Sequence, residues 1–209
     1  KKVKNALGGT VNDVVLATVA GAVGRFLEQR GISVSRQRGM DFRAFCPVSV
    51  RSDDERGAMG NRVSGMVAKL PIAEAEPRRR LERVRAITRN LKESKQALGA
   101  QVLTSDSEWT APTLATMASR LAFENRTANM IVTNVPGPQI PLYLLGARMV
   151  ETYPMVPLFS SQGLGIALFS YAGGLYWGVV CDWDQFPDLH DFICAIDASF
   201  RELCDAADA

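Results

Sequence analysis

Asn12 and Asp13 form the first pair of neighbouring side chains that could take part in chemistry. Thr10 precedes them, and Thr10-x-x-Asp13 has the pattern of a capping box, in which a hydroxyl and an acid close the first turn of a helix. On this interpretation Thr10 or Asn12 caps the helix and Asp13 complements the positive end of its dipole. On the alternative, the same polar helix start lies beside a cleft and orients a catalytic group. The spacing alone favours the capping interpretation.

Thr133 and Asn134 form a second pair, directly before Val135-Pro136-Gly137-Pro138. On the simpler interpretation the two polar residues end a short strand over 130–133, and the Pro-Gly-Pro sequence makes a turn. A hydroxyl and an amide at a strand end can also donate hydrogen bonds to a developing oxyanion. The residues by themselves favour the turn and leave the oxyanion contact open.

Asn61 and Ser64 are the candidate substrate-binding residues, in the pattern Gly60-Asn61-x-x-Ser64 at the start of a predicted strand. Asn61 is typical of a turn, because asparagine tolerates left-handed backbone geometry. A contact with a ligand is the alternative interpretation.

His190 is the only histidine of the chain. A histidine-rich metal site and any mechanism that needs a histidine pair are therefore excluded, and a histidine base must be His190 or come from another chain. His190 follows Pro187-Asp188-Leu189 in the first turn of the last predicted helix, where a surface or capping role is expected. Asp182 and Asp184 could pair, but no second acidic cluster supports glycosidase chemistry.

The four cysteines contain no Cys-x-x-Cys motif, and their scatter fits neither a zinc site nor a disulfide framework; they are Cys46, Cys181, Cys194 and Cys204. We expect small buried hydrophobic side chains in a reducing compartment, and no metal. The glycine-rich segments lack both the Walker pattern and a Gly-x-Gly-x-x-Gly after a strand, so they give nucleotide binding no support.

The composition is that of a globular domain: 209 residues, 47% hydrophobic and 22% charged, with a net charge of +2. About 70% of the unfolded surface of such a chain is buried on folding, enough for a core without disulfides or metals. The charge is too small to indicate a nucleic-acid partner. The longest weakly charged stretch, 14–23, is short of the roughly 20 residues of a membrane span. We expect no signal or transit segment, and the start without Met hints at a fragment.

Hydrophobic periodicity predicts about six strands and four helices in one mixed-sheet unit of the α/β or α+β class. Small residues between Ala17 and Gly24 predict that a neighbouring element packs closely on the first helix. Gly173-Gly174 is the predicted turn of a hairpin. The predicted helices cover 10–31, 77–95, 107–125 and 188–203, with Leu189, Phe192, Ile193, Ile196 and Phe200 inward in the last one. The predicted strands cover 42–50, 63–70, 130–133, 148–153, 163–171 and 175–182.

The helix that begins at Pro77 combines an apolar stripe with a basic remainder. The stripe contains Leu81, Val84, Ile87 and Leu91. The basic residues are Arg78, Arg79, Arg80, Arg83, Arg85, Arg89, Lys92 and Lys95. A solvated face is the simplest interpretation. The phosphates of a coenzyme or anionic lipid head groups are the alternatives.

Several of these stretches together resemble the bacterial wax ester synthase / acyl-CoA:diacylglycerol acyltransferase family. They are Thr10-Val11-Asn12-Asp13-Val14-Val15-Leu16-Ala17, Met59-Gly60-Asn61, Thr133-Asn134-Val135-Pro136-Gly137-Pro138 and the hairpin over 163–182. Each motif alone is unremarkable, and the combination is distinctive. The resemblance covers essentially the whole chain, 1–209, as the C-terminal acyltransferase domain of that family.

The resemblance implies a fold like chloramphenicol acetyltransferase and peptide-synthetase condensation domains, with two similar halves around a tunnel. Acyl-CoA is a co-substrate there, no further cofactor is needed, and the acceptor is a fatty alcohol or diacylglycerol. A His-His-x-x-x-Asp-Gly motif in the N-terminal half supplies the general base. This chain lacks that motif. Asn12 and Asp13 correspond to the family's supporting motif, and Thr133 and Asn134 to oxyanion contacts of related acyltransferases.

Three hypotheses follow. The favoured one is the C-terminal half of an O-acyltransferase, cytoplasmic and peripheral at the inner membrane face or a lipid droplet, inactive without its N-terminal half. The second is a half-domain that binds lipid or a partner without chemistry, prompted by the basic helix and by the apolar surface that a missing half would expose. The third is a complete small enzyme that uses His190 or a cysteine nucleophile.

Overall fold

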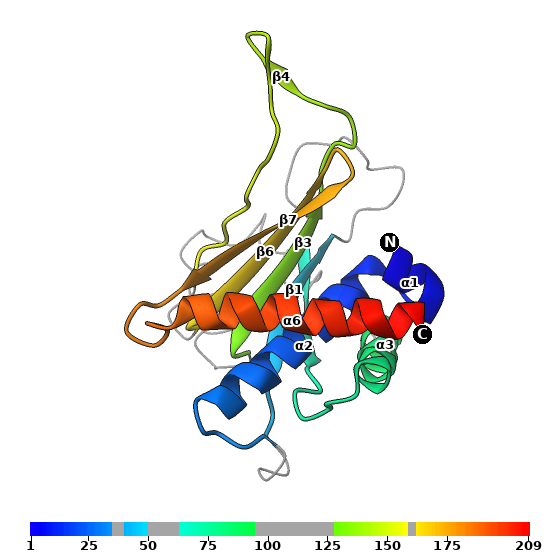
Figure 1. The fold of residues 1–209 in the computed structure, drawn as a ribbon, viewed down its shortest axis with the longest axis vertical. Helices are drawn as coiled ribbons and strands as arrows, with labels where there is room; N and C mark the ends of the chain where they lie inside the picture. Colours follow the sequence, from blue (N-terminus) through cyan, green and yellow to red (C-terminus); the bar gives the residue numbers. More distant parts are fainter. Residues whose placement is uncertain (35–39, 50–62, 95–127, 159–161) are drawn as a thin grey trace, which may run out of the picture. The chain divides into compact units, whose positions relative to one another are not determined.

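The computed structural model describes residues 1–34, 40–49, 63–94, 128–158 and 162–209 (Figure 1). The chain divides into two compact units, which we describe separately. A helical unit contains Lys1–Arg43, Ala68–Lys95 and Phe186–Ala209, and a sheet unit contains Ala44–Val67 and Gln96–Gln185. The predicted helix over 107–125 lies outside the described residues. The described elements are four helices and seven strands, five of them in one mixed sheet where the sequence predicted about six.

The helical unit consists of α1 (Lys2–Leu7), α2 (Val11–Gln29), α3 (Pro77–Glu93) and α6 (Leu189–Asp208). The predicted ends of α2 and the predicted start of α3 at Pro77 are confirmed within two residues. The short helix α1 was not predicted, because six residues are too few to show an apolar period. The two termini lie side by side, with Lys2 Nζ 2.6 Å from Asp208 Oδ1 (Figure 1).

The close packing expected at the small residues of α2 is confirmed. A Cβ atom at Gly24 would clash with the carbonyl oxygen of Ile72, and one at Gly21 would clash with Ser199 of α6 and with Arg80 of α3. Both α3 and α6 pack on α2. Any larger side chain at these two positions would push neighbouring backbone or a buried charge away.

Arg80 corrects the interpretation of α3 as a helix with a fully solvated basic face. Its side chain is buried, and the whole residue is only 2% exposed. Its guanidinium donates to the carbonyl oxygens of Ala17 (3.1 Å), Glu74 (3.1 Å) and Ala75 (3.2 Å), and its Nη2 lies 3.1 Å from Glu202 Oε2. Arg80 thereby ties α2, α3, α6 and the segment before α3 together.

The inward face of α6 differs in part from the prediction. Phe192 is buried as expected, but Ile193 and Phe200 are 45% and 43% exposed. The buried face also contains the small side chains of Ala195 and Ser199, and Ser199 lies directly against Gly21 of α2. The apolar pattern of α6 contains two stripes, and close packing of small residues decides which of them is buried.

The sheet unit is built on a five-stranded sheet in the order β2-β1-β3-β6-β7. The strands are β1 (Arg43–Ser49), β2 (Val63–Lys69), β3 (Met130–Pro136), β6 (Leu164–Tyr171) and β7 (Gly174–Cys181). β3 is parallel to β1 and β6, whereas β6 and β7 form an antiparallel hairpin. Tyr171 pairs with Gly174, so the turn consists of Ala172 and Gly173, one residue earlier than predicted. Both have positive φ (45° and 89°), as a type I′ turn requires.

The predicted strand over 148–153 is wrong. Only β4 (Tyr143–Leu144) and β5 (Ala147–Arg148) pair there, as a short antiparallel hairpin. The chain after β5 is extended but crosses a face of the sheet instead of joining its ladder. Gly178 and Gly165 leave room for this crossing, because a Cβ atom at Gly178 would clash with the carbonyl of Pro154 and one at Gly165 would press on Val156 and Leu158. Residues of a segment that crosses a sheet face alternate between exposed and half-buried, and this gives the same two-residue period as a strand in the sheet.

Residues 138–158, which we call the arm, are held at their base by Tyr171. The buried phenol accepts a hydrogen bond from the Leu142 N–H (2.8 Å) and donates one to the carbonyl oxygen of Met149 (2.9 Å). Met149 N–H in turn donates to the Leu142 carbonyl oxygen at 2.9 Å. One side chain of β6 therefore holds together the two segments of the arm that contain Leu142 and Met149.

Replacing Arg80 with Met is expected to lower the free energy of unfolding by about 3 kcal/mol, because one buried and two partly buried carbonyl oxygens lose their donor and Glu202 loses one of its partners. Urea denaturation followed by circular dichroism measures the change. Arg79→Met on the exposed side of the same helix is the matched control and should stay within about 0.5 kcal/mol of the parent. Equal effects of the two substitutions would contradict a structural role for Arg80.

Candidate functional site

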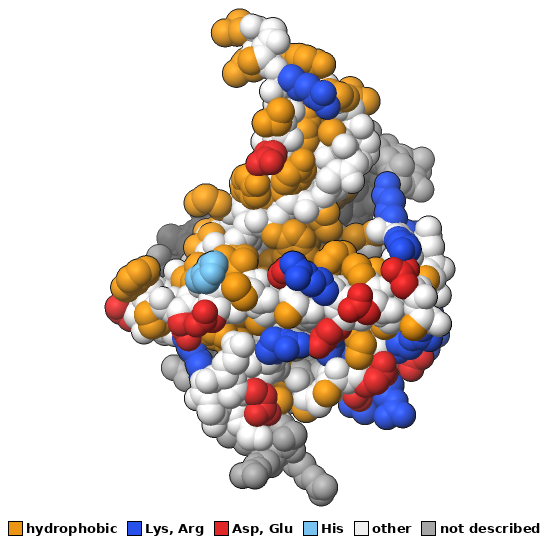
Figure 2. Space-filling model, viewed as in Figure 1, with side chains coloured by type: hydrophobic (Ala, Val, Ile, Leu, Met, Phe, Trp, Pro, Cys, Tyr) orange, Lys and Arg blue, Asp and Glu red, His pale blue; other side chains and the backbone are white. Residues whose placement is uncertain are grey.

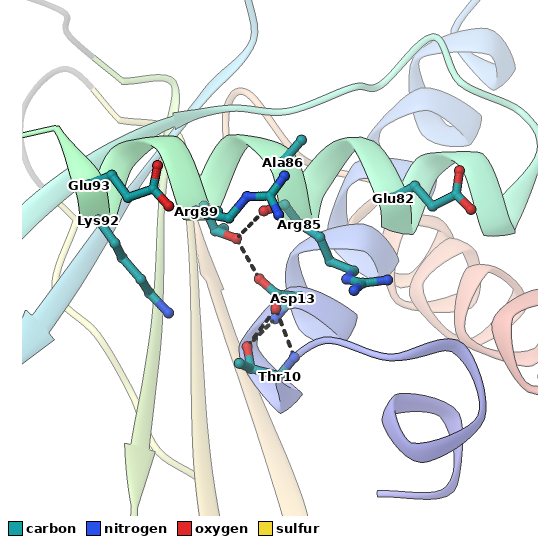
Figure 3. Close-up of a pocket in the computed structure, with 9 residues that line it drawn as sticks. Thr10, Asp13, Glu82, Arg85, Ala86, Arg89, Lys92 and Glu93 are labelled. Atoms are coloured by element: carbon teal, nitrogen blue, oxygen red, sulfur yellow. Dashed lines mark hydrogen bonds between the residues drawn. The ribbon is translucent and has the colours of Figure 1, made fainter.

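The start of α2 is closed by the capping box that the sequence predicted. Thr10 Oγ1 accepts a hydrogen bond from the Asp13 N–H (3.2 Å), and Asp13 Oδ2 accepts from the Thr10 N–H (2.7 Å) and the Thr10 hydroxyl (2.8 Å) (Figure 3). Asp13 is only 5% exposed. A carboxylate in that environment needs hydrogen-bond donors on both oxygens.

Thr88 of α3 supplies the donor for the second oxygen. Its hydroxyl donates to Asp13 Oδ1 at 2.7 Å, and this contact joins α3 to α2 through two residues that are 75 positions apart in the sequence (Figure 3). Thr88 is buried, and no motif predicted its role because it sits among the cationic residues of α3. A helix position where a threonine interrupts a basic face was the one available signal.

Arg85 holds the loop that leads into α2. Its Nη1 donates to the Leu7 carbonyl oxygen at 3.1 Å, its guanidinium lies against Gly8, and its aliphatic stem lies against Gly9. Both glycines have positive φ (79° and 92°), so the loop needs residues without a Cβ. Arg85 and Thr88 together fix the position of Asn12 and Asp13 from α3.

The two members of the Asn12-Asp13 pair differ in what they can do. Asp13 uses both oxygens within the helical unit, so it has a positioning role. Asn12 is half-buried, and its side chain makes no hydrogen bond to any residue in the described part of the chain. Asn12 is therefore the member whose amide can contact a substrate.

Thr133 and Asn134 lie inside β3, which continues to Pro136 instead of ending at residue 133 as predicted. In register they pair with Ala167 and Leu168 of β6, and both are half-buried. Neighbouring residues of a strand point to opposite faces of the sheet. At most one of the two side chains can therefore contact a given oxyanion, and Thr133 shares its face with Ile131, on the side that residues 150–158 cross.

Other candidate residues separate into those outside the described part and those with structural roles. Asn61 lies outside the described residues, and of Ser64 only the backbone, in β2, is described. Asp182 Oδ1 accepts from the Asp184 N–H at 2.9 Å, so it stabilises a turn and does not pair with the Asp184 carboxylate. His190 is exposed on α6, and its Nε2 lies 3.7 Å from the Sγ of Cys194.

None of the four cysteines forms a disulfide bond, and only one of them is fully buried. Burial raises the pKa of the Cys46 thiol to about 12, so this thiol is unreactive at neutral pH. Cys194 is exposed, which corrects the expectation that all four are buried. Within the described ranges, no cluster of three or more His, Cys, Asp or Glu side chains could hold a metal ion.

Two helix starts carry carboxylates with a lowered pKa. Hydrogen bonds from the backbone N–H groups of Arg79 and Arg78 lower the pKa of Glu76, which caps α3. A hydrogen bond from Arg30 lowers the pKa of Asp188 before α6. Both acids are structural. None of the helices in the residues that the structure covers is long and apolar enough to cross a bilayer.

Comparisons with known proteins agree on one family. The model of the WS/DGAT C-terminal domain matches residues 59–204. A Mycobacterium tuberculosis protein named as a diacylglycerol O-acyltransferase is 32% identical over 100% of this chain and 41% of its own length. The structure of the wax ester synthase/diacylglycerol acyltransferase from Marinobacter aquaeolei VT8 matches with a TM-score of 0.73 and 25% identity, over 99% of this chain and 46% of that one.

A more distant match supports the fold alone. The first condensation domain of the calcium-dependent antibiotic synthetase has a TM-score of 0.53 and 16% identity, over 98% of this chain and 40% of that one. The expected condensation-domain type of fold is thus confirmed. The chain spans about two fifths of the length of the curated relatives that it matches.

Replacing Thr88 with Val removes the donor to Asp13 Oδ1 and is expected to lower the free energy of unfolding by about 2 kcal/mol, because a buried carboxylate loses a hydrogen bond. Thr88→Ser keeps the hydroxyl and loses one methyl group, so it should cost only about 1 kcal/mol. Urea denaturation of both variants tests this. If Val and Ser cost the same, the hydrogen bond does not stabilise the helix pair.

Proposed function

The chain belongs to the family of wax ester synthase/diacylglycerol acyltransferase C-terminal domains, and from that membership we propose that it is one part of an acyl-CoA-dependent O-acyltransferase. The proposed enzyme transfers a fatty acyl group from a coenzyme A thioester to a long-chain alcohol or a diacylglycerol. The family match over 59–204 is the observation that carries this proposal. Peripheral contact with a membrane or a lipid droplet belongs to the same proposal, because both acceptors are apolar.

In this reaction the acceptor hydroxyl oxygen attacks the thioester carbonyl carbon while a general base removes the hydroxyl proton. The tetrahedral intermediate then collapses, the C–S bond breaks, and coenzyme A leaves as a thiolate that takes up a proton. His190 is the only histidine here, and it lies exposed on α6 beside Cys194. We assign the base to a histidine of the N-terminal half, outside this chain.

Asn12 is the residue of this chain that we assign to the reacting groups. Its amide is free of hydrogen bonds to the described residues, and Asp13, Thr88 and Arg85 hold the helix turn that presents it. An amide N–H can donate to the oxyanion of the intermediate or to the attacking hydroxyl oxygen. Thr133 or Asn134 of β3 remains a second candidate for the oxyanion contact.

The arm gives this chain a surface for the rest of the enzyme. Hydrophobic side chains gather along the arm (Figure 2). Eight of the fourteen exposed large hydrophobic side chains in the described residues belong to it, and Leu145 is 101% exposed. The eight are Ile140, Leu142, Tyr143, Leu144, Leu145, Val150, Tyr153 and Met155. An apolar surface of this extent indicates a contact site. Since the relatives are more than twice as long as this chain, we assign the contact to their N-terminal half.

The function is tested with the whole enzyme that carries this chain, supplied with labelled acyl-CoA and either a diacylglycerol or a long-chain alcohol. Ester formation is expected, and Asn12→Ala should lower kcat/KM by about 10²-fold while leaving stability unchanged. Asn90→Ala, an exposed asparagine of α3, is the matched control and should keep full activity. Absence of transfer to either acceptor would contradict the function, and full activity of Asn12→Ala would contradict the site.

The arm is tested by the affinity between this chain and the remaining part of the enzyme, produced separately and measured by calorimetry. Replacing Leu144 and Leu145 together with Ser should weaken the association by at least about tenfold, because two buried leucines are lost from the contact. Trp183→Ser removes an equally exposed apolar side chain outside the arm and should have no effect. An unchanged affinity of the double variant would exclude the arm tip from the contact.

A further inference from the structure

A cavity of about 440 Å³ lies within the helical unit, between α3 and the first turn of α2 (Figure 3). Thr10 and Asp13 line it from α2, and Arg85, Arg89 and Lys92 line it from α3. Its volume falls in the range of about 300–1,000 Å³ that is typical of small-ligand sites. Asp13 lines the cavity and Asn12 is its neighbour in the chain, so the cavity lies next to the proposed site.

Two groups among the cationic side chains of α3 differ in what they contact. Arg80 pairs with Glu202 at 3.1 Å, and Arg83 pairs with Glu74 at 2.9 Å. These arginines stabilise the helical unit itself. Each of these two charges is already paired with a carboxylate, so it is less available to bind a ligand.

The second group lines the cavity. Arg85, Arg89 and Lys92 recur at intervals of four and three residues, which places them on one face of the helix. Within the described residues none of the three has a carboxylate at ion-pair distance, and Arg85 gives one N–H to the Leu7 carbonyl oxygen. Most of their N–H donors are therefore available to a ligand.

Three acids also line the cavity, and their charges determine how the cavity could attract an anion. Asp13 is saturated by donors from Thr10 and Thr88, whereas Glu82 and Glu93 are exposed. The formal charges of the lining balance, so a long-range field does not draw an anion in. Guanidinium groups bind phosphate through short, directional paired hydrogen bonds, and this interaction does not need a net charge.

We propose that this cavity binds phosphate groups of the nucleotide portion of acyl-CoA, with Arg85 and Arg89 as paired donors and Lys92 as a point charge. The inference rests on the proposed function. Of the proposed reactants only the coenzyme A thioester carries phosphates, because long-chain alcohols and diacylglycerols have none. The thioester end of the same molecule then extends toward Asn12.

The test measures binding of coenzyme A and of adenosine 3′,5′-bisphosphate to the whole enzyme by calorimetry. Replacing Arg89 and Lys92 together with Gln should raise both dissociation constants about tenfold or more, because charge-assisted hydrogen bonds are lost. Pantetheine, which has no phosphate, should bind the parent and the variant equally. The KM for acyl-CoA should rise in the same proportion with kcat nearly unchanged, as expected for a loss of uniform binding.

Two matched variants sharpen the result. Arg79→Gln removes the same charge from the same helix but does not line the cavity, so it should leave the dissociation constants unchanged. Glu93→Gln removes a negative charge from the lining and should tighten coenzyme A binding. Equal weakening by Arg79→Gln and by the double variant would overturn the proposal, because it would indicate attraction by overall charge.

Other outcomes would also overturn it. Equal loss of pantetheine affinity in a variant whose circular dichroism matches the parent would mean that these cations do not act through phosphate. Weaker binding to vesicles that contain phosphatidylglycerol, with coenzyme A binding unchanged, would assign these cations to a lipid surface. Failure of acyl transfer with phosphate-dependent binding intact counts against the proposed function alone, whereas acyl transfer with an unchanged KM in the double variant counts against this cavity alone.

Discussion

The helical unit depends on the rule that a buried charge must have its hydrogen-bonding groups satisfied. Asp13 meets this rule with donors from α2 and α3, and Arg80 meets it with acceptors from α2, the segment before α3, and α6. Neither residue can keep its partners if one helix shifts along another. The two groups therefore fix the relative positions of the three long helices more narrowly than apolar packing alone would.

Local sequence patterns predicted the parts of the fold that local interactions determine. The sequence predicted three such features: the capping box at Thr10, the start of α3 at Pro77 and the β6–β7 hairpin. Each of them is determined by residues that lie close together in the chain. The strand expected over 148–153 was wrong for a non-local reason. Whether an alternating segment joins a ladder or crosses a sheet face depends on Gly165 and Gly178, which come later in the chain.

The candidate site shows the same limit. The pair Asn12-Asp13 was identifiable, but its division into a positioning acid and a free amide was not, because that division depends on Thr88, 75 residues away from Asp13. Arg80 was hidden for a related reason. A sequence shows that a helix is basic, whereas only the packing shows which of its cations are buried, which form ion pairs and which line a cavity.

A composition of 47% hydrophobic residues indicated a self-contained globular domain, yet much apolar area lies on the arm instead of in a core. Composition counts apolar residues without saying where they lie. One half of an enzyme with an exposed interface and a complete domain can therefore have the same hydrophobic percentage. On the proposed function the single histidine favours the first of these, because the base is assigned to another part of the polypeptide. If the base lies on another part of the polypeptide, that part must be held in register with Asn12, and such positioning needs a large contact surface. On that proposal the exposed arm and the base assigned outside this chain are two consequences of one division of the active site.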